Sequence, residues 1–239
     1  MIISAHQPAY NPWLGFMHKI LLSDIFVVMD DVQFEKNSFI NRNKILQNSN
    51  EIMLTIPVKT KDYKLKTIKE IEVLDNRWQI KHLKSIEQSY RKSRNFEVIF
   101  EKLKEIYELE SDYLIDYTNA YLSFIIEYLG IDTKIAFASD LNIKSKKLDY
   151  VCELTNILDG DIFVFGSQGK EYADIEYLKS KNIQPYFQEY KHPVHEQSSK
   201  EFHSYMGILD LLFNVDKDKV VNIILSNNIT KEDLRKIYV

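Results

Sequence analysis

The sequence is poor in cysteine, glycine and proline, and it has no long hydrophobic run. Its single cysteine, Cys152, excludes an internal disulfide framework and a cysteine metal cluster, and it fits a reducing cytoplasm. Six glycines and five prolines leave little material for a linker, so we expect one domain, residues 1–239, in preference to two. No apolar run approaches the roughly 20 residues that cross a bilayer, and no signal peptide is recognisable at the N-terminus. These absences predict a soluble, cytoplasmic protein without a membrane span.

The charges are nearly balanced. Lysines and arginines number 31 against 35 aspartates and glutamates, which gives a formal net charge of −4. This balance provides no broad basic field for DNA or for an acidic membrane surface. A phosphate-bearing partner must therefore be bound by a local group of donors. Composition leaves the oligomeric state open, with a homodimer among the options.

The first thirty residues have the pattern of a strand, a helix and a second strand. Residues 2–5 form a short apolar run, residues 13–21 repeat apolar side chains at helical spacing, and residues 25–29 read as a buried strand. Parallel strands joined by a helix place the loop after the first strand at the carboxyl edge of the sheet, where open α/β folds bind ligands. The loop from His6 to Pro12 is therefore a candidate site.

The rest of the chain contains a long helical middle and a second region of strand–helix alternation. The alternation predicts an α/β fold with a mostly parallel, Rossmann-like sheet, and the middle predicts a helical insertion at about 77–130 that ends at Gly130. Further strands are expected at 52–57, 67–73, 133–138, 161–165 and 184–188, and further helices at 78–90, 96–106, 113–129, 148–158 and 172–179.

Polar residues follow both N-terminal strands. A histidine such as His6 can bind a phosphate or act as a base near neutral pH, although it could equally tie down its own loop. Asp30 and Asp31 come directly after the second strand, where a carboxylate can hold Mg²⁺, accept sugar hydroxyls or act as a base. Because neighbouring strand residues point to opposite faces, at most one of the two carboxylates need face a site.

Three further segments carry donors. Lys36, Arg42 and Lys44, interleaved with asparagines, suit phosphate oxygens, although such a segment is also typical of a surface turn. The turn 166–169 could bind an anion through backbone amides, but it is neither a P-loop nor a dinucleotide fingerprint. His192 and His195 are separated by a proline, so we predict no metal site there. No G-x-S-x-G or H-E-x-x-H motif is present, which leaves positioning and electrostatics as the expected catalytic means.

These motifs together resemble the WbqC-like family. The likeness is most specific over the first forty-odd residues and continues to the C-terminal region, although His195 stands where an aromatic residue is expected. The segments that carry it are 6–16, 19–20, 24–27, 30–36, 41–45, 165–169 with Tyr172, 192–193 with Gln197, and 208–214.

The resemblance implies an amide-forming aminoacyl transferase, glycyl in the first instance, that acylates the amino group of a nucleotide-linked amino sugar in bacterial surface polysaccharide (O-antigen) biosynthesis. Its partners would be that sugar and an activated amino acid, and no cofactor is required unless the carboxylate is activated in the site, which calls for ATP and Mg²⁺. From the chemistry of acyl transfer itself we expect His6 to act as the base or a phosphate contact, and Asp30 or Asp31 to orient the amine or the sugar. Substrate contacts are implied for Gln7, Tyr10, Trp13, Lys19, Gln33, Lys36, Asn41, Arg42, Asn43, Lys44, Gly166, Ser167, Tyr172, His192 and Gln197.

A fainter similarity links the opening loop to pantothenate synthetase, of the nucleotidyltransferase-like fold. The paired histidines of that enzyme are represented here by His6 and Ala9, and His18 is too distant in sequence to be assumed a substitute. Two alternatives therefore stay open: a nucleotidyltransferase or adenylate-forming ligase, and a non-catalytic sugar-nucleotide binder. All three require the ends of the first two strands and the Arg42 segment to converge on one pocket.

Overall fold

A five-stranded parallel sheet forms the centre of the computed structural model, which describes residues 1–238. The strand order is β5-β2-β1-β6-β7, and all four neighbouring pairs are parallel. This arrangement confirms the expected Rossmann-like α/β fold. The strands are β1 (Ile2–His6), β2 (Ile25–Val28), β5 (Lys134–Phe137), β6 (Ile162–Phe165) and β7 (Gln184–Phe187).

Helices cover both faces of this sheet because alternate residues of each strand point to opposite sides. On one face Ile2 and Val164 pack with Leu22 and with Leu234 of the C-terminal helix. On the other face Ile3 and Phe163 pack with side chains of the helices that follow β5 and β6. The first face is covered by α1 (Leu14–Leu21) and α9 (Lys231–Tyr238), and the second by α5 (Leu148–Ile157) and α6 (Ile175–Ser180).

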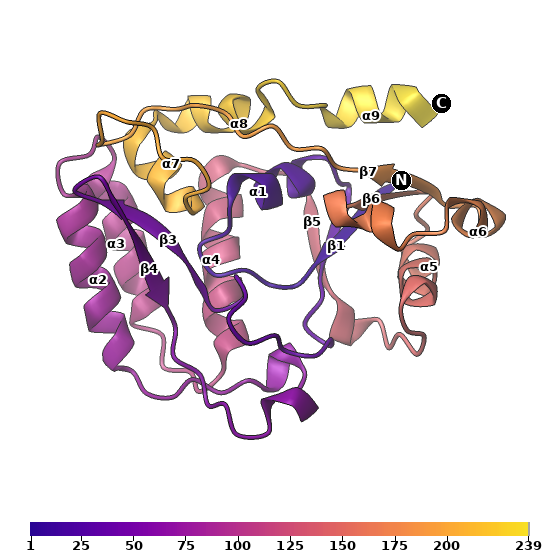
Figure 1. The fold of residues 1–239 in the computed structure, drawn as a ribbon, viewed down its shortest axis with the longest axis horizontal. Coiled ribbons are helices and arrows are strands. Elements are labelled where there is room, and N and C mark those ends of the chain that lie inside the picture. Colours follow the sequence, from indigo (N-terminus) through magenta and orange to yellow (C-terminus); the bar gives the residue numbers. More distant parts are fainter. Residues whose placement is uncertain (239) are drawn as a thin grey trace.

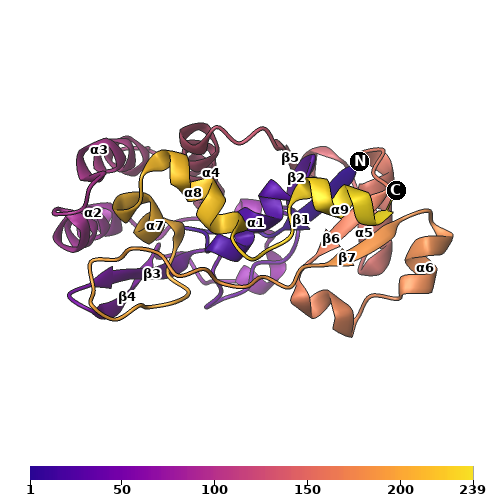
Figure 2. The ribbon, with the colours of Figure 1, turned by 90° about the horizontal axis from the view of Figure 1, so that it is seen from above.

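Most of the expected helical middle lies beside the sheet, and its last helix packs against the edge strand β5 (Figures 1 and 2). It packs with an antiparallel hairpin and with two C-terminal helices, and it ends at Gly130, whose φ of 63° provides the left-handed cap expected of a glycine. Figure 1 shows the chain leaving β7, crossing to this helical region and returning through α8 to α9. The elements are α2 (Arg77–Tyr90), α3 (Phe96–Tyr107), α4 (Leu114–Leu129), α7 (Ile208–Asn214) and α8 (Lys217–Leu225), with β3 (Arg42–Gln47) and β4 (Asn50–Thr55).

One predicted element is wrong, and one helix begins later than expected. Residues 67–73 form no strand: Thr67 and Glu70 make a capping box that begins a short 3-10 helix (Ile68–Glu70), and only single bridges flank it. The helix expected at 172–179 begins at Ile175 as α6, because the side chain of Asp174 accepts a hydrogen bond from the Tyr177 amide and caps it there. Another 3-10 helix (Ser167–Glu171) precedes it, and two more span Tyr63–Leu65 and Ala138–Asp140.

Strand β3 was not predicted, because it lies in the polar stretch before residue 52. It pairs with β4 in a hairpin outside the parallel sheet. Its Ile45 and Leu46 side chains are fully buried. Cys152 is buried in α5, as its apolar neighbours predict. Among residues 1–238, no helix combines the length and the hydropathy that crossing a bilayer requires.

Candidate active site

A cavity of about 600 Å³ opens where β1, β6 and β7 end, on the face that α1 covers. We call it the His6 cavity. Its floor comes from His6 at the end of β1 and from Lys19 on α1, and its rim comes from the turn after β6 and from the loop after β7. Six predicted residues line it: His6, Trp13, Lys19, Gly166, Ser167 and His192.

The imidazole of His6 is held in one neutral form. Its Nδ1 lies 2.8 Å from the Gln7 carbonyl oxygen, and because a carbonyl only accepts, Nδ1 must carry the hydrogen. Nε2 then has a free lone pair and no hydrogen bond within residues 1–238. The ring packs edge-on against Trp13 and Phe16, each with a centroid distance of 5.3 Å. Burial, and secondly the charge of Lys19, lower the pKa of His6 to about 4, so His6 is neutral at physiological pH.

Lys19 is a buried amine without a counter-ion. Its Nζ donates a 2.9 Å hydrogen bond to the carbonyl of Ala5, the side chain is only 5% exposed, and it forms no ion pair within the described part of the chain. Burial lowers the pKa of Lys19 to about 7. An anion bound in the cavity would restore the charged form, since an opposite charge nearby favours it. Lys19 is therefore equipped to recognise a carboxylate, a phosphate or a developing oxyanion.

The rim of the His6 cavity contains residues that the motifs did not single out. Gln188 follows β7, and its Nε2 donates to the Gly15 carbonyl (2.9 Å) and to His18 Nδ1 (2.8 Å). His18 in turn donates from Nε2 to the Ile229 carbonyl, so it is a structural residue and lines no part of this cavity. The position of Gln188 at the end of a predicted strand was the one signal that could have indicated it.

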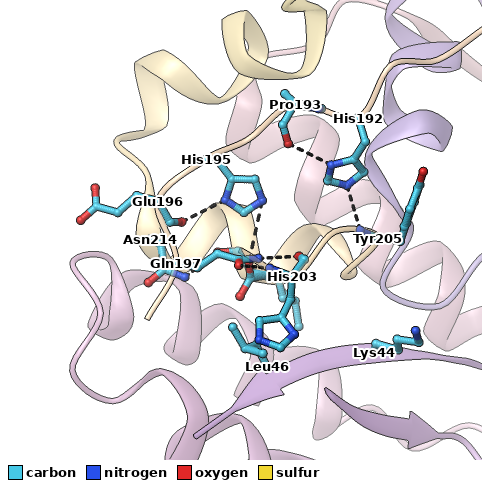
Figure 3. Close-up of polar contacts among 12 residues, drawn as sticks. Lys44, Leu46, His192, Pro193, His195, Glu196, Gln197, His203, Tyr205 and Asn214 are labelled. Atoms are coloured by element: carbon cyan, nitrogen blue, oxygen red, sulfur yellow. Dashed lines mark hydrogen bonds and ion pairs between the residues drawn. The ribbon is translucent and has the colours of Figure 1, made fainter. Parts of the chain in front are cut away.

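The C-terminal loop, residues 188–207, closes another side of the His6 cavity. His192 donates from Nδ1 to the Pro193 carbonyl (2.9 Å) and accepts at Nε2 from the Tyr205 amide (3.2 Å), as Figure 3 shows. Tyr205 also lines the cavity, and nothing in its sequence context indicated this. Gln197 lies elsewhere: it bonds the His203 backbone and the buried carboxylate of Asp210, and so fixes the loop rather than facing a substrate.

A second cavity of about 950 Å³ opens at the carboxyl end of β2, on the face that α5 covers. We call it the lysine-rimmed cavity, after Lys144, Lys146 and Lys147. Asp31, Gln33 and Tyr172 line it, and none of these three lines the His6 cavity. The hydroxyl of Tyr150 donates to Asp31 Oδ1 at 2.8 Å.

Asp30 has no open side. Its side chain is buried, and its two oxygens accept from the backbone amide (2.9 Å) and the hydroxyl (2.7 Å) of Ser139. The carboxylate thus binds the start of the 3-10 helix after β5. Of the two adjacent aspartates only Asp31 lines a cavity, in agreement with the alternation of side chains along a strand.

The donors of residues 36–44 do not reach either cavity. Arg42 donates to the Asn37 backbone and side chain, and Lys44 pairs with Glu51 at 2.6 Å. Asn41 donates to the Ile56 carbonyl at 2.8 Å, and Lys36 lines neither cavity. The expected convergence of His6, the aspartates and the Arg42 segment is therefore wrong. The physical reason is that residues 42–47 form a strand of the separate hairpin and not a loop at the edge of the parallel sheet.

Two comparisons place this chain among known proteins. The model of the WbqC-like protein family matches residues 7–222. The chain belongs to the WbqC-like family. It is also 28% identical, over 211 residues, to the uncharacterized protein Rv1507c of Mycobacterium tuberculosis, an alignment that covers 87% of this chain and 91% of that protein.

Part of the WbqC-like motif is structural. Asn11 has a φ of 46° and lies between the hairpin and α7: its carbonyl accepts from the Asn43 side chain (2.6 Å) and its Oδ1 accepts from the Leu209 amide (3.1 Å). Gly207 lies directly against it, because a Cβ there would come within 2.1 Å of Asn11 Nδ2. These contacts hold the opening loop of the WbqC-like chain in place.

Two other motif residues also lie outside the cavities. Tyr10 is fully buried, and its hydroxyl bonds His82 Nδ1 (3.0 Å) and the Tyr107 hydroxyl. Gln7 is half-buried, and its carbonyl orients His6. Of the predicted site residues in the first 45 positions, His6, Trp13 and Lys19 line one cavity, and Asp31 and Gln33 line the other.

Proposed function

We propose that this WbqC-like protein is an aminoacyl transferase, glycyl in the first instance, that forms an amide on the amino group of a nucleotide-linked sugar in bacterial surface polysaccharide biosynthesis. The observation that carries the proposal is the pairing of a neutral His6, whose Nε2 is free, with an uncompensated Lys19 in one cavity. Acyl transfer to an amine needs a proton acceptor and a cationic or hydrogen-bonding group for the oxyanion. This cavity supplies both, so the proposal now rests on His6 and Lys19 alone and no longer on the convergence of the aspartates and the Arg42 segment.

In the proposed acyl-transfer step, His6 and Lys19 each have one role. The sugar amine attacks the carbonyl carbon of an activated aminoacyl donor, the new C–N bond forms, and the bond from that carbon to the leaving group breaks. His6 Nε2 accepts the proton that the amine loses, because the Nδ1–H bond to Gln7 keeps the lone pair on Nε2. Lys19 stabilises the negative charge that develops on the carbonyl oxygen.

Donor activation is a separate chemical requirement. A free carboxylate does not acylate an amine at a useful rate, so the donor must be an acyl-adenylate, a thioester or an aminoacyl-tRNA. The assay therefore has three arms. The protein is incubated with a UDP- or dTDP-amino sugar and with glycine plus ATP, a glycyl thioester or glycyl-tRNA, and the product is identified by mass spectrometry as the sugar nucleotide carrying one glycyl group.

His6→Gln tests the proposed centre, and His203→Gln serves as its control because His203 lies outside both cavities. We expect turnover to be lost in the first variant and kept in the second. Release of pyrophosphate without amide would favour a nucleotidyltransferase instead. Tight binding of the sugar nucleotide without any product would favour a non-catalytic binder.

A further inference from the structure

We propose that the lysine-rimmed cavity binds the nucleoside diphosphate part of a substrate. The binding itself is independent of the proposed function, but assigning this nucleotide to the amino sugar rests on it. The cavity combines an apolar floor, an exposed aromatic ring and three lysines, and this combination matches a planar base joined to a pyrophosphate.

The floor suits a base. Met29, Val32, Leu148 and Val151 are half-buried and pack on the apolar cluster between the sheet and α5. They present apolar atoms to a cavity that is open to solvent. Tyr172 stands beside them with 64% of its surface exposed, and its other contact is an edge-to-face approach to Phe165 at 6.2 Å. An exposed tyrosine ring is a suitable partner for a stacked base.

The rim suits phosphates. Lys144, Lys146 and Lys147 are exposed, and none of them forms an ion pair within residues 1–238. Their backbone is nevertheless ordered, because the carboxylate of Glu153 accepts from the amides of Lys144 (3.2 Å) and Ser145 (2.9 Å). Three cations without counter-ions on one ordered loop can neutralise the charge of a pyrophosphate group.

Asp31 indicates where the phosphates cannot lie. Its Oδ1 accepts from Tyr150, but Oδ2 has no hydrogen bond in the described residues. A free carboxylate oxygen repels phosphate and accepts hydrogen bonds from ribose hydroxyls or from a base N–H. The nucleoside therefore lies toward Asp31, and the pyrophosphate lies toward the lysines.

The short 3-10 helix Ser167–Glu171 connects the two cavities. Ser167 lines the His6 cavity, whereas Tyr172, which caps the helix, lines the lysine-rimmed cavity. A sugar attached to the bound pyrophosphate would therefore extend from a site next to this turn. The arrangement assigns the nucleotide to one cavity and the acyl chemistry to the other.

Isothermal titration calorimetry with UDP, dTDP, ADP and inorganic pyrophosphate tests the inference on the full chain. The test variant is K144A/K146A/K147A, and the matched control is K61A/K64A/K69A, which removes the same charge from three exposed lysines that line neither cavity. We expect the test variant to bind each ligand roughly tenfold more weakly or worse, and the control to change affinity by less than about twofold. Equal losses in both variants, or the absence of nucleotide binding by the wild type at millimolar concentration, would overturn the inference.

Two further variants separate this inference from the proposed function. Tyr172→Leu should weaken nucleotide binding and leave pyrophosphate binding unchanged, whereas His6→Gln should leave both unchanged. Loss of nucleotide binding in His6→Gln would move the nucleotide to the His6 cavity and refute the assignment. If no acyl transfer is found but nucleotide binding depends on the three lysines, the inference stands and the proposed function fails.

Discussion

The two cavities at the carboxyl edge of the sheet differ in the burial of their lysines. Lys19 is buried, has a lowered pKa and donates only to a backbone carbonyl, whereas Lys144, Lys146 and Lys147 are exposed on a loop. A buried charge without a counter-ion costs stability and is retained where an anion must be recognised at a defined position. Exposed lysines cost little and suit a mobile, strongly hydrated group such as a pyrophosphate. The contrast suggests chemistry in one cavity and nucleotide binding in the other.

The largest effect is expected at His6. His6→Gln removes the proton acceptor but keeps a polar side chain, so the turnover number should fall by roughly 100-fold or more, as general-base removal does. Nucleotide affinity should not change. The measurement is the turnover number beside calorimetric affinity for UDP, and equal turnover in variant and wild type would remove His6 from the mechanism.

The next effect concerns stability. Lys19→Met should raise the free energy of unfolding by about 2 to 3 kcal/mol near neutral pH. The variant no longer buries an ammonium, which costs the wild type more than about 1 kcal/mol of stability for each unit by which its pKa is lowered, and it loses only the hydrogen bond to Ala5. The cost of burying the wild-type ammonium is complete below about pH 7, decreases as pH rises, and is lost only above about 10.5, where the lysine is neutral in both states. The advantage of the variant should therefore shrink over that window.

Denaturant unfolding of both proteins at about pH 6, 8 and 10 measures this trend. Transferase activity should fall in the same variant, because the oxyanion loses its partner. A variant that is less stable than the wild type at about pH 6 would contradict the uncompensated burial of Lys19.

Substitutions of the two adjacent aspartates should have different effects, one mainly on stability and the other mainly on nucleoside binding. Asp30→Ala should lower the free energy of unfolding by about 2 kcal/mol, since it leaves the Ser139 amide and hydroxyl without their acceptor. Asp31→Ala loses one partly buried hydrogen bond from Tyr150 and should destabilise less, but it should weaken nucleoside binding while sparing pyrophosphate. Thermal unfolding and calorimetry of the two variants side by side test this, and the reverse pattern would exchange their roles.

The smallest effect is expected at Arg42. Its guanidinium is occupied by Asn37 and faces neither cavity, so Arg42→Ala should change nucleotide affinity by less than about twofold. Calorimetry with UDP decides the matter. A tenfold loss of UDP affinity would show that the segment 36–44 contributes to nucleotide binding, and it would contradict the assignment of the nucleotide to the lysine-rimmed cavity.

Much of this fold could be predicted because the parallel strands are short, apolar and bounded by loops. Each of the five expected strands of the central sheet, from residues 2–5 to 184–188, is present. The strand β3 was missed because it begins with three polar residues, Arg42 to Lys44, and it pairs with β4 in a hairpin outside the central sheet. The false strand at 67–73 arose because it is rich in β-branched residues, whereas the local capping box of Thr67 and Glu70 decided its conformation.

The candidate site was predictable only in part. His6, Asp31, Gly166 and Ser167 each follow a strand that ends at one edge of the sheet, and topology alone places them there. Lys144, Lys146 and Lys147 follow β5, but nothing in the local pattern distinguished them from an ordinary basic turn. Gln188 and Tyr205 belong to segments whose contact with α1 depends on the path of the whole C-terminal loop.

The sequence by itself determined the α/β class, the positions of the central strands along the chain and family membership, because hydrophobic periodicity and a long specific motif are local properties of the chain. Only the tertiary structure decided that some motif residues line two separate cavities, whereas Asn11 makes structural contacts with the hairpin and with α7. The reason is that side-chain direction and burial depend on packing between segments far apart in sequence. Asp30 and Asp31 demonstrate this most directly, because neighbours in the chain face a structural serine and an open cavity respectively.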